Sequence, residues 1–426
     1  MKVLLDIKKK ETTSVLIFVT IFAVYSVISM TKSAYASAIA SIIGEGIFNK
    51  SQAGTVNAGF YLLYGMGQLF GVKMVDKVSP VKFIYFTLFG TFVSTLGMAF
   101  ARSFEAMLLL WSFCGLVQFA IWPAVLRIIS EYLLPVHKDR AKVYISFSYC
   151  VGMLFSYLLA SIVLKFVRWP GLFFVVSLIV LASLVIWIIV TRATKEEAYE
   201  IKKMNSEITL YFKEAKEKEN NGQKPMGIGK IILMSGVFLL LIPSFVRSAL
   251  DAGLKSWVPT MIVENYSVSA SFANMMTTVL VFVNLSGVFI VNFFYPRIIK
   301  NAVLGYGLCF LVSIPFTVML LFTGKIHLAV VVFLLIVVTT MMYSGHQLVN
   351  IIIPASFAKY NRAGAVAALI NALGSFGSVV ANILFGFLAE NYGWNTTITS
   401  WIILGTVAVA FCAMAVPLWT KFNKGE

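Results

Sequence analysis

Long apolar runs, each roughly 20 residues in length, recur along the whole chain and are separated by polar segments. A run of this length crosses about 30 Å of hydrocarbon as a helix. The runs are continuous, whereas the strands of a membrane barrel alternate between apolar and polar positions, so helices are predicted. The pattern predicts twelve spans near residues 13–43, 54–74, 81–101, 106–131, 143–165, 171–191, 230–263, 270–294, 302–322, 327–353, 364–388 and 395–416.

One polar segment is much longer than the others and extends from residue 191 to residue 230. Its charges favour a solvated helix, followed by a flexible Asn-Gly stretch. We therefore expect an all-α integral membrane protein with three parts. These are an N-terminal six-helix bundle over residues 1–190, a cytoplasmic linker over 191–230 and a C-terminal six-helix bundle over 231–426.

The two halves repeat each other. Arg140 follows the fourth span as Arg362 follows the tenth, and Trp169 precedes the sixth span as Trp394 precedes the twelfth. The first and seventh spans also correspond, through MTKSAYASAIASI and ALDAGLKSWVPTMI. A duplicated six-helix unit is the layout of a large class of transporters, in which the substrate site lies between the halves.

Composition agrees with lipid as the solvent. The chain is 59% hydrophobic and 12% charged, with a mean hydropathy of +0.89, whereas about 25% of the residues of a soluble domain are charged. A net charge of +16 would indicate nucleic acid in a soluble protein. Cytoplasmic loops of membrane proteins collect Lys and Arg, so no nucleic-acid partner is expected here. With both termini and the linker on the cytoplasmic side of the plasma membrane, the external basic residues are Lys50, Arg102, Lys165, Arg168 and Lys325.

Away from the ends of the predicted spans, charged residues are expected at membrane depth, namely Lys32, Arg127, Arg247, Asp251 and Lys255. A charge at membrane depth costs on the order of 3 kcal/mol and usually marks a functional site. Arg247, Asp251 and Lys255 are four residues apart and therefore share one helix face. Asp251 either neutralises one of these bases in a structural ion pair, or organises a cavity in which positive charge remains in excess and attracts anions. A third role, proton coupling by Asp251, ranks lower because an acid among several bases stays ionised.

Three stretches carry recognisable motifs: Asp76-Lys77-Val78-Ser79-Pro80 after the second span, the segment from Phe113 to Leu133, and SWVPT at residues 256–260. They resemble the major facilitator superfamily, and within it the organophosphate:phosphate antiporter family of glycerol-3-phosphate and hexose-phosphate transporters. The resemblance covers nearly the full length. It implies twelve helices in two bundles that alternately open a central site to either side.

The resemblance also implies two arginines that clamp the substrate phosphate, one from each half. The first falls on Lys32 and the second on Asp251, and a family histidine falls on Tyr149. A Lys holds phosphate as a point charge without the bidentate fork of Arg. Asp251 carries a negative charge where the family has a positive one. The expected cargo therefore includes sugar acids as well as phosphate esters.

Other candidates have competing structural roles. Arg127 precedes Glu131 by four residues, which favours an internal ion pair. In the sequence repeat, Arg127 corresponds to Asn350, and His346 lies one turn before Asn350. A histidine within a membrane span more often has a packing role than a functional one. The candidate substrate contacts are Lys32, Tyr35, Trp122, Arg127 and Tyr149 in the first half, and Arg247, Asp251, Lys255, His346 and Asn350 in the second.

These observations predict a secondary transporter for a small organic anion, such as a sugar phosphate, a glycerol phosphate or a sugar acid, driven by anion exchange or by protons. The alternatives are a transporter-like membrane sensor of an organic anion, and a facilitator for a neutral or cationic compound. The missing GxxxxGK motif argues against an ATP-driven pump, and no nucleophile or acid pair with convincing spacing indicates an enzyme. The four cysteines have neither disulfide nor metal spacing. We expect a monomer without metal or cofactor.

Overall fold

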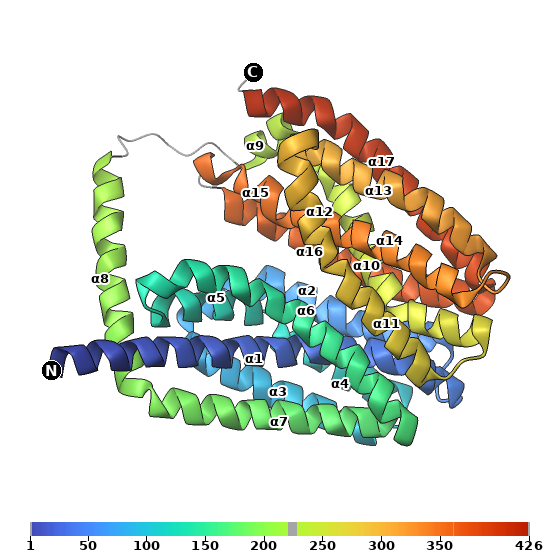
Figure 1. Ribbon diagram of the computed structural model, residues 1–426, viewed down its shortest axis with the longest axis horizontal. Coiled ribbons are helices and arrows are strands. Elements are labelled where there is room, and N and C mark those ends of the chain that lie inside the picture. Colours follow the sequence, from blue (N-terminus) through green and yellow to red (C-terminus); the bar gives the residue numbers. More distant parts are fainter. Residues whose placement is uncertain (1, 220–227, 361, 425–426) are drawn as a thin grey trace.

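The computed structural model describes residues 2–219, 228–360 and 362–424 (Figure 1). Only the backbone is described at 2–7, 70–77, 211–219, 228, 230, 359 and 424, so the side chains of Asp76 and Lys77 in the family motif lie outside the described set. Within the described ranges the regular structure is helical. Eleven helical segments, some of them runs of consecutive helices, are long and apolar enough to cross a membrane. The predicted span 54–74 corresponds to a further helix, α2.

The first half and the linker contain eight helices. They are α1 (Lys2–Gly44), α2 (Lys50–Lys77), α3 (Pro80–Phe100), α4 (Phe104–Gln118), α5 (Ile121–Tyr132), α6 (Pro135–Phe166), α7 (Trp169–Ala193) and the linker helix α8 (Lys195–Glu219). The second half contains α9 (Ile228–Ser235), α10 (Val237–Tyr266), α11 (Ala270–Asn284), α12 (Ser286–Phe294), α13 (Ala302–Met319), α14 (Leu328–Gln347), α15 (Ile353–Ala355), α16 (Ala363–Asn391) and α17 (Gly393–Lys424). Short π-helical turns occupy Tyr295–Ile299 and Leu348–Ile352, and 3₁₀ turns occupy Leu320–Phe322 and Ala358–Tyr360.

Proline explains where two of the predicted spans are interrupted. The span predicted at 106–131 is divided into α4 and α5, because Pro123 cannot donate to the carbonyl of Phe119 and its ring displaces that carbonyl. The span predicted at 327–353 passes from α14 through the π turn Leu348–Ile352, just before Pro354. Such π turns often lie at functional sites.

The helices of each half pack together, with α1 against α6 and α3 against α7 in the first half, and α10 against α16 and α13 against α17 in the second. Between the halves, α2 packs on α16 and α6 packs on α11. Figure 1 shows the two halves as two layers, with α8 crossing them at the edge where the N-terminus lies. The boundaries at residues 190 and 230 stay predictions.

The linker helix is held against the first half by polar contacts. Lys10 pairs with Glu200 at 2.7 Å and Lys202 pairs with Glu131 at 2.9 Å. Asn205, which is 4% exposed, donates to the backbone oxygens of Glu131 and Leu133, at 2.9 Å each. The helix predicted in the linker is therefore present as α8, fixed to the ends of α1 and α5.

Candidate functional site

A cavity of about 390 Å³ lies between the halves, which is within the usual size of a small-molecule site. It is bounded by α1, α2, α5 and α6 on one side and by α10, α14, the π turn 348–352 and α16 on the other. The first-half wall is mainly aromatic, with Tyr25, Tyr61, Tyr64, Trp122, Tyr149 and Tyr157. The second-half wall is mainly polar, with Arg247, Ser248, Asp251, Lys255, His346, Gln347, Asn350, Asn371 and Ser375.

Lys32 is the cation of the first-half wall. Its ammonium donates to the hydroxyl of Tyr64 at 3.3 Å and lies 4.4 Å from the centre of that ring. No carboxylate lies within 4 Å of it among the side chains that the structure describes. Lys32 is therefore held in place by an aromatic side chain, and its charge is left unmatched.

Of the two cations on α10 that line the cavity, one is paired with a carboxylate of the described chain and the other is not. Asp251 and Lys255 form an ion pair of 2.7 Å, and the Lys255 ammonium lies 5.8 Å from the centre of the Tyr149 ring. Arg247 instead donates to the hydroxyl of Ser248 at 2.6 Å. The described lining residues thus carry three cations and one carboxylate, so the cavity keeps an excess of two positive charges.

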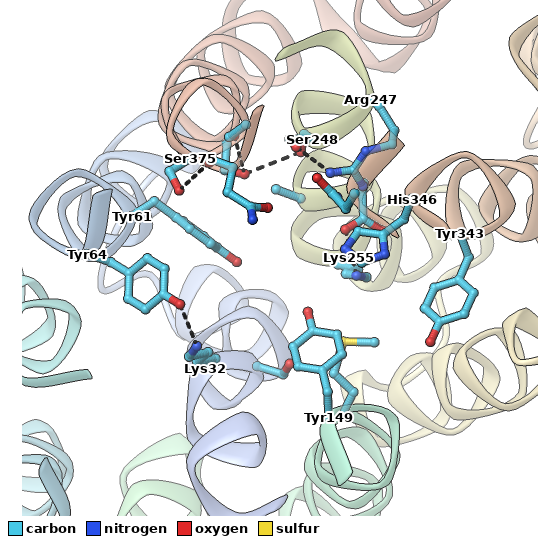
Figure 2. Close-up of a pocket in the computed structure, with 18 of the residues that line it drawn as sticks. Lys32, Tyr61, Tyr64, Tyr149, Arg247, Ser248, Lys255, Tyr343, His346 and Ser375 are labelled. Atoms are coloured by element: carbon cyan, nitrogen blue, oxygen red, sulfur yellow. Dashed lines mark hydrogen bonds and ion pairs between the residues drawn. The ribbon is translucent and has the colours of Figure 1, made fainter. Parts of the chain in front are cut away.

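Arg247 is deeply placed and only partly bonded. It is 7% exposed, and its Nε atom has no hydrogen-bond partner within the described chain. Its side chain passes Gly345 on α14, where a Cβ atom would lie 3.7 Å from the Arg247 Cδ atom. Figure 2 shows Arg247 and His346 on one wall and Lys32 on the facing wall. One cation from each half therefore faces the same space.

His346 and Asn350 line the same polar wall, one on α14 and the other on the π turn that follows. The ring of His346 stacks on Tyr343 with 6.2 Å between the ring centres. Its Nδ1 atom and the Oδ1 atom of Asn350 are buried, and neither has a partner among the described residues.

Eight of the ten candidate contacts line the cavity, and two do not. Tyr35 is fully buried in the first half, with its ring centre 5.4 Å from that of Trp111. Arg127 pairs with Glu131 at 2.9 Å and donates to the backbone oxygen of Val78 at 2.9 Å. This ion pair is the structural alternative that the sequence left open, and it holds Arg127 away from the lining.

Tyr61 and Tyr64 are among the lining residues that sequence reasoning missed. Together with Gln68 they recur at spacings of three and four along α2, which places them on one helix face. Tyrosine often serves only for packing, so the residue type alone did not indicate a site. The usable signal in the sequence was the shared helix face of these two tyrosines and the polar Gln68.

At the end of the cavity away from α8, bonds join α2 of the first half to α10 and α16 of the second. Asn57 donates from its amide nitrogen to Ser256 at 2.9 Å and to Asn382 at 2.8 Å, and it accepts from Trp111 at 3.2 Å. Nearer the surface, Lys50 pairs with Glu264 at 3.0 Å and Glu390 at 3.7 Å. We refer to the contacts of Asn57 and Lys50 together as the seal.

Glycine permits the close approach of helices at the seal. A Cβ atom at Gly54 of α2 would collide with the backbone oxygen of Asn382, and one at Gly386 of α16 would lie 2.7 Å from the backbone oxygen of Lys50. Small residues of this kind let membrane helices approach closely.

Metal chemistry has little support in these residues. Over the described residues, no group of three or more His, Cys, Asp or Glu side chains is placed to hold a metal ion. The four cysteines are free and buried. The arrangement can instead attract, desolvate and orient a small anion.

Comparisons with known proteins concern the family and the fold of the chain. A family model described as "Major Facilitator Superfamily" matches residues 17–374. The chain is 20% identical over 425 residues to the "Probable hexose phosphate transport protein" of Chlamydia muridarum, covering 97% of this chain and 92% of that protein. It is 22% identical to the "D-galactonate transporter" of Escherichia coli O6:H1, covering 91% of each. Among solved structures, a bacterial homologue of the human lysosomal transporter Spinster gives a TM-score of 0.76 at 15% identity, covering 96% of this chain and 98% of that chain.

Proposed function

We propose that this chain, which belongs to the Major Facilitator Superfamily, is a secondary transporter that carries a small organic anion across the plasma membrane by alternating access. The expected cargo is a sugar phosphate, a glycerol phosphate or a sugar acid. The names of the relatives, which include hexose phosphate and D-galactonate, support this range of cargo. An exchanged anion or a co-transported proton supplies the energy. Binding and transport need no cofactor, and one copy of the chain suffices.

One observation carries the proposal: Lys32 and Arg247 line one cavity from opposite halves, and neither has a carboxylate within 4 Å among the described side chains. An excess of positive charge at membrane depth is unfavourable until an anion compensates it. An anion held by both cations also draws the two halves toward each other. Arg247 offers the forked donor geometry that suits a carboxylate or a phosphate, and Lys32 adds a point charge.

Asp251 organises the site rather than contacting the anion. Its ion pair with Lys255, at 2.7 Å, neutralises one of the three cations of the cavity and fixes the Lys255 ammonium near Tyr149. Arg247 then remains available. A carboxylate that contacted the cargo directly would repel it.

We place both termini and α8 on the cytoplasmic side, following the distribution of basic residues. The seal formed by Asn57 and Lys50 then lies on the external side. In this state the site exchanges cargo with the cytoplasm. Opening of the seal and closure of the α8 end would expose the same site to the outside.

The decisive experiment measures flux in proteoliposomes together with binding to the purified protein. We expect exchange or uptake of a labelled sugar phosphate or sugar acid, and loss of it in Lys32→Gln and Arg247→Gln. Lys82→Gln is the matched control, because Lys82 is exposed and outside the cavity. Binding without flux would indicate a sensor. Binding of a neutral sugar that survives Lys32→Gln would overturn the anion assignment.

A further inference from the structure

Three buried polar atoms that have no hydrogen-bond partner among the described residues belong to one wall of the cavity. They are Nε of Arg247, Nδ1 of His346 and Oδ1 of Asn350, and all three residues are lining residues. Almost all buried polar groups in proteins are hydrogen-bonded, so each exception asks for an explanation. Three of them on one wall of one cavity indicate that a bound molecule supplies the missing partners.

The backbone has an irregular turn where Asn350 enters the cavity. In a regular α-helix the carbonyl of Asn350 would accept from the nitrogen of residue 354, but that residue is a proline and has no N–H. The chain forms the π turn Leu348–Ile352 instead. The turn places Asn350 among the lining residues, whereas its counterpart in the sequence repeat, Arg127, is bound to Glu131 outside the cavity. The feature therefore belongs to the second half alone.

The chemistry of the three atoms is mixed. Nε of Arg247 can only donate, which suits an anionic oxygen, whereas Oδ1 of Asn350 can only accept. An amide oxygen gains nothing from a carboxylate or a phosphate dianion, since those groups also only accept. It needs a donor on the cargo, and so does the imidazole of His346 in the tautomer that leaves Nδ1 as an acceptor. A hydroxyl group satisfies both kinds of partner.

We propose that His346 and Asn350 bind a hydroxyl group of the cargo beside the anionic group held by Arg247, and so select hydroxylated anions over their deoxygenated analogues. This inference rests on the proposed function, because it assumes an organic anion in the cavity. On binding, the two side chains turn these buried, unpaired polar atoms toward the cargo. A site built to bind a hydroxyl rejects the analogue without it strongly, because its own polar atoms are then left unpaired.

The test compares pairs of anions that differ only in hydroxyl groups: glycerol 3-phosphate against propyl phosphate, and galactonate against hexanoate. Dissociation constants are measured by calorimetry on the full-length wild-type protein. For the pair that contains the better ligand, we expect the deoxygenated anion to bind at least about 10-fold more weakly. In Asn350→Leu and His346→Phe, the ratio of the two constants should fall toward one, while the constant for the deoxygenated anion stays nearly unchanged.

Asn391→Leu is the control, because Asn391 is exposed at the end of α16 and, among the described residues, its side chain bonds only to the oxygen of Phe387 in its own helix. It should keep the wild-type ratio. Equal binding of both members of each pair by the wild type would overturn this inference and leave the transporter proposal standing, and this comparison needs no variant to fold. A ratio that is unchanged in both variants would also overturn it. If no charged probe binds at all, the proposed function fails, and this inference fails with it.

Discussion

Asp251 accepts a hydrogen bond from Lys255, one turn further along α10, with 2.7 Å between carboxylate and ammonium. Arg247, one turn earlier on the same face, bonds to Ser248 instead. The choice has a local reason: an acid placed four residues before a base is the favoured order in a helix, because it agrees with the helix dipole. This preference decides which cation is neutralised and which one remains for a ligand.

Removing Asp251 should therefore destabilise the protein through Lys255. In Asp251→Asn the Lys255 ammonium loses its partner in a largely buried place, which lowers the melting temperature. The double variant Asp251→Asn/Lys255→Gln removes both charges and should recover most of the loss. Melting followed by intrinsic fluorescence checks this. An equal loss in the single and double variants would show that the pair does not act as a unit.

Lys32 should contribute to anion affinity through its charge. A hydrogen bond to a charged group contributes about 1.5–3 kcal/mol, so Lys32→Gln is expected to weaken anion binding by about 10- to 100-fold. Lys32→Arg should retain binding or strengthen it, because the guanidinium adds a fork of donors. Titration at two ionic strengths measures both effects. If Lys32→Gln binds the anion as well as the wild type, Lys32 does not contact the cargo.

The seal should limit access from the end away from α8. In Asn57→Ala, three buried atoms of Ser256, Asn382 and Trp111 lose a partner, at a cost of about 1–3 kcal/mol for each one left unbonded. We expect faster modification of a reporter cysteine at Ser33, a lining residue, by a membrane-impermeant thiol reagent added from that side. Thr278→Ala is the control, because it removes a hydroxyl that donates to the oxygen of Asn274 within its own helix. Identical labelling rates in all proteins would contradict a gating role.

The contact between Lys202 and Glu131 should persist through neutral pH. Burial lowers the pKa of Lys202, but hydrogen bonds to Glu131 and Tyr132 outweigh this and leave the pKa above its usual value of 10.5. A raised pKa in the folded state means that the stabilisation is complete below the unfolded pKa and is lost as pH rises through the folded one. The melting-temperature difference between wild type and Lys202→Gln should be small, constant from about pH 6 to 9, and smaller above 10.5. Lys203→Gln, exposed on the same helix, should show no such dependence.

Hydropathy was enough to place the helices, because lipid leaves the backbone few other ways to bond. It could not choose between Arg127 and Arg247, since both lie in apolar runs with an acid four residues away. Only the fold shows that Glu131 forms an ion pair with Arg127, while Asp251 forms one with Lys255. The π turn at Leu348–Ile352 was also beyond the sequence pattern, because apolar periodicity does not report a single added residue in a helical turn.

The two unmatched cations in the cavity also bear on how the protein is handled. Chloride, sulfate and inorganic phosphate are small anions that the same field attracts, and purification buffers supply them in large excess. Each would compete with the cargo, so an affinity measured in phosphate-buffered saline would be understated. A buffer of bulky zwitterions with little salt should therefore reveal the tightest binding.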